Sequence, residues 1–447
     1  MAAQSGRSNE IVSINVRSLA SLKAEQKDAR FLMPRSYCIF SIFSIFSIPS
    51  ILFRHNESSF LPNCFSIGPI HRGKNHLVAA EKIKINYLTS VLSRVVTDLP
   101  GEMSEESKEV EEQKVLSDLI NAVKSIEKQA SACYADYDFA AELGDEFVNT
   151  MLLDALFIIE LFRKDAEEVK EHDDPIFSMS CMLQFLHHDL ILLENQIPWL
   201  VLEILFEKTR LPGETKSLIE LALFFFANTF TSHPPPKQTQ ASRFKDQDVK
   251  HILDLLRLSL VLPSQELKKD TATGWQPILS ITRLKEAGVK FKKGTAESIL
   301  DIKFKGGCLE IPSLLIQETT ETIFRNLIAY EQCWTHCPPI FTCYAKLLDN
   351  LIVTNDDMEI LFKREVLDIW LSLNDSTQFF NNLYHDTYVK EFYYAELLDE
   401  LDCHCRRWWP QMRVYYLQNF TKPWAIVAQI YAFIMFFLTL WQTYIKK

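Results

Sequence analysis

The chain has 447 residues, with 47 Lys and Arg against 58 Asp and Glu, so its formal net charge is −11 at pH 7. Such an acidic chain offers no extended face for a phosphate backbone, and nucleic acid is therefore excluded as an expected partner. Hydrophobic residues make up 47% of the chain, whereas Gly and Pro number only 11 and 18, which excludes a fibrous or wholly disordered protein.

The N-terminal part of the chain begins with a polar lead. Residues 1–35 are expected to be disordered, and Met1–Asn15 contains no apolar stretch of the kind that follows a basic start in a cleavable signal peptide. The uncharged segment Ser36–Phe53 then repeats Ser-Ile-Phe. Its five Ser and Pro49 favour an extended buried segment, although a second membrane crossing stays open as an alternative.

Helical periodicity dominates the next part of the chain. Ser66–Gly73 is predicted to be a turn-rich element, because Gly68 and Gly73 permit positive φ. The acid-rich stretch Gly101–Gln113 predicts either a solvated loop or the exposed start of a helix. Helices are predicted over Leu77–Val96, Asp145–Phe162, Met179–Leu205 with a kink or restart at Pro198, Thr320–Gln332, Ala345–Ile352, Asp356–Phe362 and Val389–Leu401.

Two segments interrupt this helical pattern. Thr231–Ser242 contains three consecutive Pro and predicts a linker, which is either a domain boundary or a long surface loop. Between about 288 and 312 the hydrophobic period becomes two, with Gly at the turns, which predicts a small antiparallel β meander. Arg283–Lys305 carries seven Lys or Arg against three acids. We interpret this charge as protection of a strand edge, and a basic surface that faces an anionic leaflet is the alternative.

The most informative segment is Trp424–Ile445, which runs 22 residues without a charge. A helix of that length spans about 33 Å, enough for a hydrocarbon core of about 30 Å. Residues 423–447 are therefore predicted to be a transmembrane anchor and short tail, with a buried core helix as the alternative. The aromatic residues that would serve the anchor are Trp424, Tyr431, Trp441 and Tyr444.

Several ordered sequence blocks carry a family resemblance. They are Ser66-Ile-Gly-Pro-x-His-x-Gly73 with Glu81 and Lys84, Met151-Leu-Leu-Asp154, Asp174-Pro-Ile-Phe177, Asp189-Leu-Ile-Leu-Leu-Glu-Asn-Gln-Ile-Pro198, Gly288-Val-Lys-Phe291, Leu309-Glu-Ile-Pro312, Arg325-Asn-Leu-Ile-Ala-Tyr-Glu331 and Asn419-Phe-x-x-Pro-Trp-Ala-Ile426. With them, the chain resembles the plant family DUF247 from about Ile39 to its end. It departs from the family pattern at Ala80, at Ala155-Leu156 and in the repeated segment Phe40–Ile48.

The resemblance implies a fold and a location more than an activity. It implies a C-terminal membrane helix and no established biochemical activity, and the link of some grass relatives to pollen self-incompatibility suggests recognition or signalling. From it and the patterns above we expect a mainly α fold: a helical body over residues 36–422, a small β meander and one transmembrane helix. The body is expected to be cytosolic and the membrane to be the plasma membrane rather than an endomembrane.

Polar residues of these blocks are the candidate site. His187, His188, Asp189, Glu194, Asn195 and Gln196 fall on one predicted helix and suggest either a metal or acid–base site or a buried network. Each His lies six or seven positions from Glu194, so we favour the network. The residues predicted to have this structural role are Gly68, Pro69, His71, Asp154, Asp189, Glu194, Asn195, Gln196, Pro198, Asn326 and Glu331.

Two chemical alternatives to that network exist in the sequence. An enzyme would bring Asp189, Glu194 and His71 together in a solvent-reachable cleft. Cys333-x-x-His336-Cys337 with Cys403-His404-Cys405 could form a zinc site, but the ten Cys fit ordinary free thiols better. No catalytic residue, cofactor or metal is predicted. The expected function is that of a membrane-anchored interaction protein with an unknown protein partner, and an unrecognised membrane-bound enzyme is the alternative.

Overall fold

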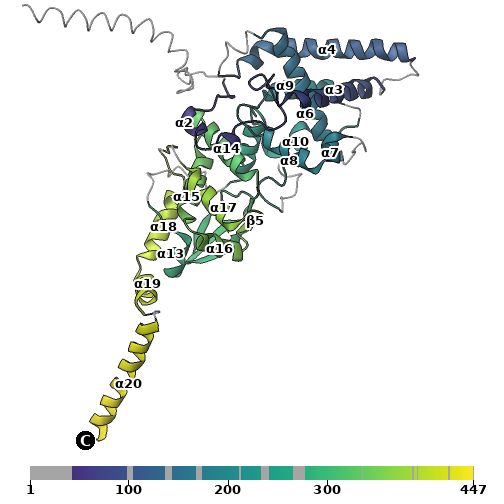
Figure 1. The fold of residues 1–447 in the computed structure, drawn as a ribbon. Helices are drawn as coiled ribbons and strands as arrows, with labels where there is room; N and C mark the ends of the chain where they lie inside the picture. The colour runs from purple at the N-terminus through teal and green to yellow at the C-terminus, as the bar shows by residue number, and fades with distance from the viewer. Residues whose placement is uncertain are drawn as a thin grey trace, which may run out of the picture. The chain divides into compact units, whose positions relative to one another are not determined.

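A computed structural model describes residues 43–97, 104–135, 143–167, 174–210, 213–232, 241–264, 277–334, 336–384, 387–389, 391–420 and 423–445. The protein is mainly helical with small β-sheets, as predicted (Figure 1). The predicted polar lead and residues 233–240 of the Pro-rich segment lie outside the described residues. The chain divides into two compact units. Unit 1 takes the described residues up to Pro263 with Gln317–Thr342 and Leu383–Tyr388, and unit 2 takes Ser264–Ile316, Cys343–Asn382 and the described residues from Val389 onward.

The regular elements in the described part of unit 1 are all helices, apart from one isolated β-bridge. Its elements are α2 (Ser50–Phe53), η2 (Glu57–Ser59), α3 (Val78–Thr97), α4 (Glu105–Ser131), α6 (Asp145–Glu167), α7 (Pro175–Ser178), α8 (Ser180–Asp189), α9 (Trp199–Lys208), α10 (Leu218–Phe225), η3 (Ser242–Phe244), α12 (Ile252–Val261) and α14 (Thr320–Cys333). Local sequence sets several of their starts. Ser104 caps α4 through the Ser107 N–H, and Ser217 and Glu220 form a capping box at α10.

Helix α6 is the centre of unit 1, where it packs against α3, α4, α9 and α10 (Figure 1). The sequence predicts one apolar stripe on this helix. In the structure nearly all positions from Met151 to Lys164 are buried, including polar Asp154, Glu160 and Arg163. A helix buried on every side is typical of the middle of a large core, and its polar side chains therefore need partners.

The segment before α2 is extended and buried. Ser44 and Ile45 donate their backbone N–H groups to the Cys133 carbonyl at 2.9 and 3.0 Å, and Ile45 forms a β-bridge with Tyr134. The side chains of Phe46 and Ile48 are also buried. The interpretation of Ser36–Phe53 as an extended buried segment is thus confirmed for residues 43–49, and residues 36–42 lie outside the described residues.

The predicted helical run from Met179 to Leu205, with a kink or restart at Pro198, is wrong for residues 190–198. Helix α8 ends at Asp189 and α9 begins at Trp199, so residues 190–198 leave the helix well before Pro198. The reason is that the Asn195 and Gln196 side chains donate to the carbonyls of Asp189, Leu190 and Leu192, which replaces helical bonds with local side-chain bonds. The polar cluster predicted for one helix is therefore split between a helix end and a turn.

Unit 2 combines helices with two small sheets. Its elements are α13 (Ile281–Glu286), β1 (Lys290–Gly294), β2 (Lys303–Lys305), β3 (Cys308–Pro312), β4 (Leu314–Ile316), α15 (Ile340–Leu351, mostly in this unit), α16 (Asn355–Lys363), β5 (Leu367–Ile369), α17 (Leu373–Leu383, likewise), α18 (Ala395–Cys405), α19 (Trp408–Phe420) and α20 (Pro423–Ile445). The predicted helix over Val389–Leu401 in fact begins at Ala395.

The predicted antiparallel meander is a mixed sheet of strand order β1-β3-β2. Strands β2 and β3 form the expected hairpin, because Gly306 and Gly307 both adopt positive φ at its turn. Strand β1, however, pairs with β3 in parallel. Gly294 allows this pairing, since a Cβ there would lie 2.9 Å from the Pro312 nitrogen. A second sheet, parallel β4 and β5, was not predicted.

Candidate functional site

The carboxylate of Asp189 organises the loop at Asn63–Phe65 in unit 1. It accepts the backbone N–H groups of Asn63, Cys64 and Phe65 at 2.8, 2.8 and 2.7 Å, and its side chain is fully buried. An ionised carboxylate that accepts several N–H groups forms strong, directional bonds. Asp189 therefore fixes the path of a loop that is more than 120 residues away in sequence.

Two neighbouring amides continue this arrangement. Asn195 accepts the Ile67 N–H at 2.7 Å and donates to the Phe65 carbonyl at 2.9 Å. The amide oxygen of Gln196 accepts the Leu253 N–H at 3.2 Å at the start of α12. Both side chains are buried. The turn at 190–198 thus bonds on one side to the Asn63–Gly68 loop and on the other to α12.

Gly68 and Asp154 join the same loop to α6. Gly68 adopts φ +74°, and a Cβ at this position would lie 2.6 Å from the Gln196 carbonyl oxygen. Its N–H donates to Asp154 at 2.8 Å, and the fully buried ammonium of Lys84 donates to the other oxygen of Asp154 at 2.6 Å. Lys84 also bonds the Ser66 carbonyl. Pro69, the next residue after Gly68, is also buried.

His71 and Glu194 are close to each other, as the enzyme alternative requires, with 3.5 Å between Nε2 and a carboxylate oxygen. Burial lowers the pKa of His71 to about 4, with Lys74 and His76 adding to the effect, and burial raises the pKa of Glu194. The other oxygen of Glu194 accepts the Ile48 N–H at 2.7 Å. The side chain of His71 is only 2% exposed and that of Glu194 15%.

These contacts bear on the choice between a cleft and a network. A cleft needs side chains that converge on solvent, whereas Asp189 is fully buried and both of its oxygens are occupied by backbone donors. His71 and Glu194 face each other within the protein. The geometry is that of a buried polar network that holds loops to helices.

Helix α14 and Pro198 extend this network. Asn326 accepts the Leu193 N–H at 2.9 Å and donates to the Ser59 carbonyl at 2.7 Å. Glu331 pairs with Arg257 at 2.7 Å and accepts the Phe341 and Thr342 N–H groups at 3.0 and 2.8 Å. Pro198, at φ −60°, is the N-cap residue of α9. Asp189, Asn195, Gln196, Gly68, Asp154, His71, Glu194, Asn326 and Glu331 all lie in unit 1.

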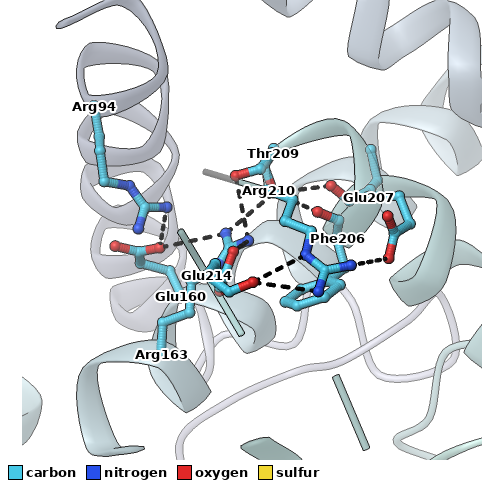
Figure 2. Close-up of polar contacts among 9 residues, drawn as sticks. Arg94, Glu160, Arg163, Phe206, Glu207, Thr209, Arg210 and Glu214 are labelled. Carbon is cyan, nitrogen blue, oxygen red and sulfur yellow. Dashed lines mark hydrogen bonds and ion pairs between the residues drawn. The ribbon is translucent and has the colours of Figure 1, made fainter. Parts of the chain in front are cut away.

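A second polar cluster in unit 1 was not anticipated from the sequence. Figure 2 shows the Arg163 guanidinium facing the Glu214 carboxylate, with bonds of 2.7 and 2.9 Å, while Arg94 binds Glu160 at 2.6 Å. Arg163 also lies over the Phe206 ring. Its side chain is 3% exposed, so its charge is neutralised within the protein. Sequence spacing gives no signal for a pair 51 positions apart.

The cysteine pattern does not assemble into a metal site in the described part of the chain. No group of three or more His, Cys, Asp or Glu side chains there has the spacing to hold a metal ion. Burial raises the pKa of Cys333 to about 12 and raises that of Cys337 as well. Both thiols are therefore protonated near neutral pH, as is usual for buried cysteines outside reactive sites.

Helix α20 is the one candidate membrane span among the described helices. Its apolar stretch Val427–Tyr444 is long enough to cross a bilayer, and none of it is buried in the protein. Tyr431, Trp441 and Tyr444 are 65, 66 and 83% exposed. The side chain of Trp424 lies outside the described part of the structure. By length and composition, α20 has the properties predicted for Trp424–Ile445.

Comparison with known proteins gives a family and two relatives. Residues 45–438 match the family model DUF247, described as a plant protein of unknown function. The chain is 25% identical over 436 residues to the UPF0481 protein At3g47200 of Arabidopsis thaliana, an alignment that covers 91% of this chain and 86% of the relative. It is 35% identical over 92 residues to the putative UPF0481 protein At3g02645 of the same plant, covering 20% and 17% of the two chains. No solved structure matches.

Proposed function

We propose that this chain, which belongs to the DUF247 family of plant proteins of unknown function, is a membrane-anchored interaction protein. Helix α20 crosses a bilayer, and the folded body stays in the cytosol and binds a protein partner in recognition or signalling. The observation that carries the proposal is an apolar helix that the protein itself does not bury.

The exposure of α20 supports a bilayer as its surroundings. Large aromatic and aliphatic side chains face outward around the whole helix, among them Phe433, Ile434 and Phe437 at 65, 51 and 52% exposure. A continuous apolar surface of this size is unfavourable in water and favourable in lipid. A helix of 23 residues spans about 35 Å, which suits the thicker plasma membrane better than the endoplasmic reticulum.

Charge and cysteine chemistry support a cytosolic body. Arg406, Arg407 and Arg413 precede α20, against Lys446 and Lys447 after it, and basic residues favour the cytosolic side. The cysteines of the described residues are free thiols, as is usual in a reducing compartment. Both observations agree with a body that is not exported.

The buried network supports interaction rather than catalysis. The polar residues of the family blocks are used to hold loops and helices together, with Asp189 and Asn326 fully buried. What the body then offers to other molecules is its folded surface. Binding through such a surface needs a rigid scaffold, which a buried hydrogen-bonded network provides.

The experiment introduces charges into α20 and follows the protein in cell fractions. Ile434→Arg with Phe437→Arg puts two charges near the middle of the span, where each disfavours insertion by about 2.5–3.5 kcal/mol. Tyr444→Arg, at the end of the span, is the matched control. We expect the double variant in the soluble fraction and the control in the membrane fraction. Membrane retention of the double variant and of a chain lacking 423–447 would refute α20 as the anchor.

A second experiment tests the partner. Proximity labelling from the N-terminus of the intact chain is compared with labelling from the chain that lacks 423–447. We expect a set of proteins labelled only when the chain is anchored. If neither chain enriches any protein over a free labelling enzyme, the interaction role is wrong.

A further inference from the structure

A cavity of about 850 Å³ lies within unit 2, between α13, the start of β1, α16 and α19. Its volume falls within the range of about 300–1,000 Å³ that is typical of small-molecule sites. Apolar Val289, Phe291, Ile360 and Leu417 line part of its wall. The charged lining residues are basic Lys285, Lys290, Lys363, Arg364 and Arg413 and acidic Glu286, Asp356 and Glu359.

The charge balance of this cavity is more positive than that list suggests. Glu359 is paired with Lys363 at 2.5 Å, and Glu286 with Arg283 at 3.2 Å. Lys285 also interacts electrostatically with Glu359, whereas Lys290, Arg364 and Arg413 form no ion pair with any residue in the described ranges. Three unpaired cations against one remaining carboxylate, Asp356, create a local site for an anion in a chain of net charge −11.

The turn at Gly288 makes room for one of these cations. Gly288 adopts φ +92°, a conformation that favours glycine, and the Arg413 side chain lies across it. A Cβ at this position would be 3.6 Å from the Arg413 Cδ. Arg413 of α19 and Lys290 of β1 both line the same cavity.

Helix α19 relates the cavity to the membrane. Its buried or half-buried residues Pro410, Val414 and Leu417 follow one face of the helix. Its opposite side exposes aromatic rings, with Trp409, Tyr415 and Tyr416 at 75, 56 and 54% exposure. Trp and Tyr favour the headgroup region of a bilayer, and α20 begins only a few residues after α19. Helix α19 therefore suits the headgroup layer, and it carries Arg413 and Leu417 of the cavity.

We propose that this cavity binds a multiply phosphorylated inositol ring that is presented by a membrane lipid. Several unpaired cations in one cavity match several phosphates better than a single charge, and basic pockets next to membrane helices suit such headgroups. A free inositol phosphate has the same chemistry and is the other source of the ligand. The choice of a lipid as the source rests on the proposed membrane attachment, whereas the charge of the cavity does not.

Titration of the full-length protein in detergent tests the proposal without depending on insertion into a bilayer. The probes are short-chain phosphatidylinositol bisphosphate, its free headgroup inositol trisphosphate, and short-chain phosphatidylserine. We expect the bisphosphate lipid to bind most tightly. Equal binding of phosphatidylserine would overturn the phosphorylated inositol, and equal binding of the free headgroup would overturn the lipid as its source.

Charge reversal locates the site. Lys290→Glu with Arg413→Glu should weaken binding of the bisphosphate lipid at least about tenfold, because two cations of the cavity change sign. The matched control is Lys292→Glu with Lys293→Glu, on the same strand and with the same charge change but outside the cavity lining. All four side chains are exposed, so both variants should fold, and the control loses in addition the exposed Lys292–Glu310 pair of 3.2 Å. Equal loss in the control would mean non-specific attraction and would overturn the site.

Discussion

The buried charge pair between Lys84 and Asp154 offers a sharp test of the network. The two side chains are fully buried, and 2.6 Å separates the ammonium nitrogen from the carboxylate oxygen. At an effective dielectric constant of about 20 their attraction is about 6 kcal/mol, which offsets part of the desolvation of the two charges, and burial still raises the pKa of Asp154. Asp154→Ala leaves the buried ammonium with only Glu81, at 2.7 Å, and the Ser66 carbonyl as partners, and it leaves the Gly68 N–H without its acceptor. We expect a loss of about 3–5 kcal/mol in the free energy of unfolding.

The assay is thermal unfolding of the full chain in detergent, followed by circular dichroism. At about 2 °C per kcal/mol for a unit of this size, the expected fall in melting temperature is about 6–10 °C. The matched control is Glu105→Ala, which removes the carboxylate from an exposed Lys108 pair of 2.8 Å and should change little. Asp154→Leu combined with Lys84→Met should be more stable than either single change. If Asp154→Ala and Glu105→Ala have the same melting temperature, the buried pair does not stabilise the protein as expected.

Three further predictions concern the same unit. Gly68→Ala should destabilise the protein more than Gly73→Ala. Both glycines adopt positive φ, but only at Gly68 would an added Cβ lie 2.6 Å from another atom, the Gln196 carbonyl oxygen. Equal melting temperatures of the two variants would contradict this. Burial lowers the pKa of His251 to about 3, below its value of about 6.5 in the unfolded chain. The neutral imidazole therefore contributes its full stability above pH 6.5, and this contribution is lost as the pH falls toward 3. The melting temperature of His251→Gln should therefore fall less than that of the parent between pH 6.5 and 4, with exposed His336→Gln as the control. Glu214→Gln should lower the melting temperature by several degrees, since it leaves the buried Arg163 with only the more distant Glu160 carboxylate, at 3.9 Å.

The sequence predicted those parts of the fold that depend on local patterns. Helix α6 has a run of apolar residues at helical spacing, and the β2–β3 turn has two consecutive Gly, so both elements were predictable. The turn at 190–198 was not predictable, because its Asn195 and Gln196 side chains accept hydrogen bonds from the distant N–H groups of Ile67 and Leu253. Apolar periodicity carries no information about such partners.

The same limit applies to the sheet and to the candidate site. The order β1-β3-β2 depends on close packing of Gly294 against Pro312, which no single segment reveals. Arg163 and Glu214 meet across 51 positions, and the cations of the unit 2 cavity come from α13, β1, α16 and α19. The sequence indicated a basic region at Arg283–Lys305, but the cavity also needs Arg364 and Arg413 from later in the chain.

The topology of α20 tests the central claim most directly. A glycan-acceptor sequence is added after Lys447, and the full chain is expressed in plant cells and treated with a glycosidase. The natural acceptor Asn374-Asp-Ser376, whose asparagine is exposed, reports on the body. If α20 crosses the bilayer with the body in the cytosol, only the chain with the added acceptor loses mass on digestion. A mass loss in the chain without it would place the body outside the cytosol, and no loss in either chain would mean that α20 does not cross.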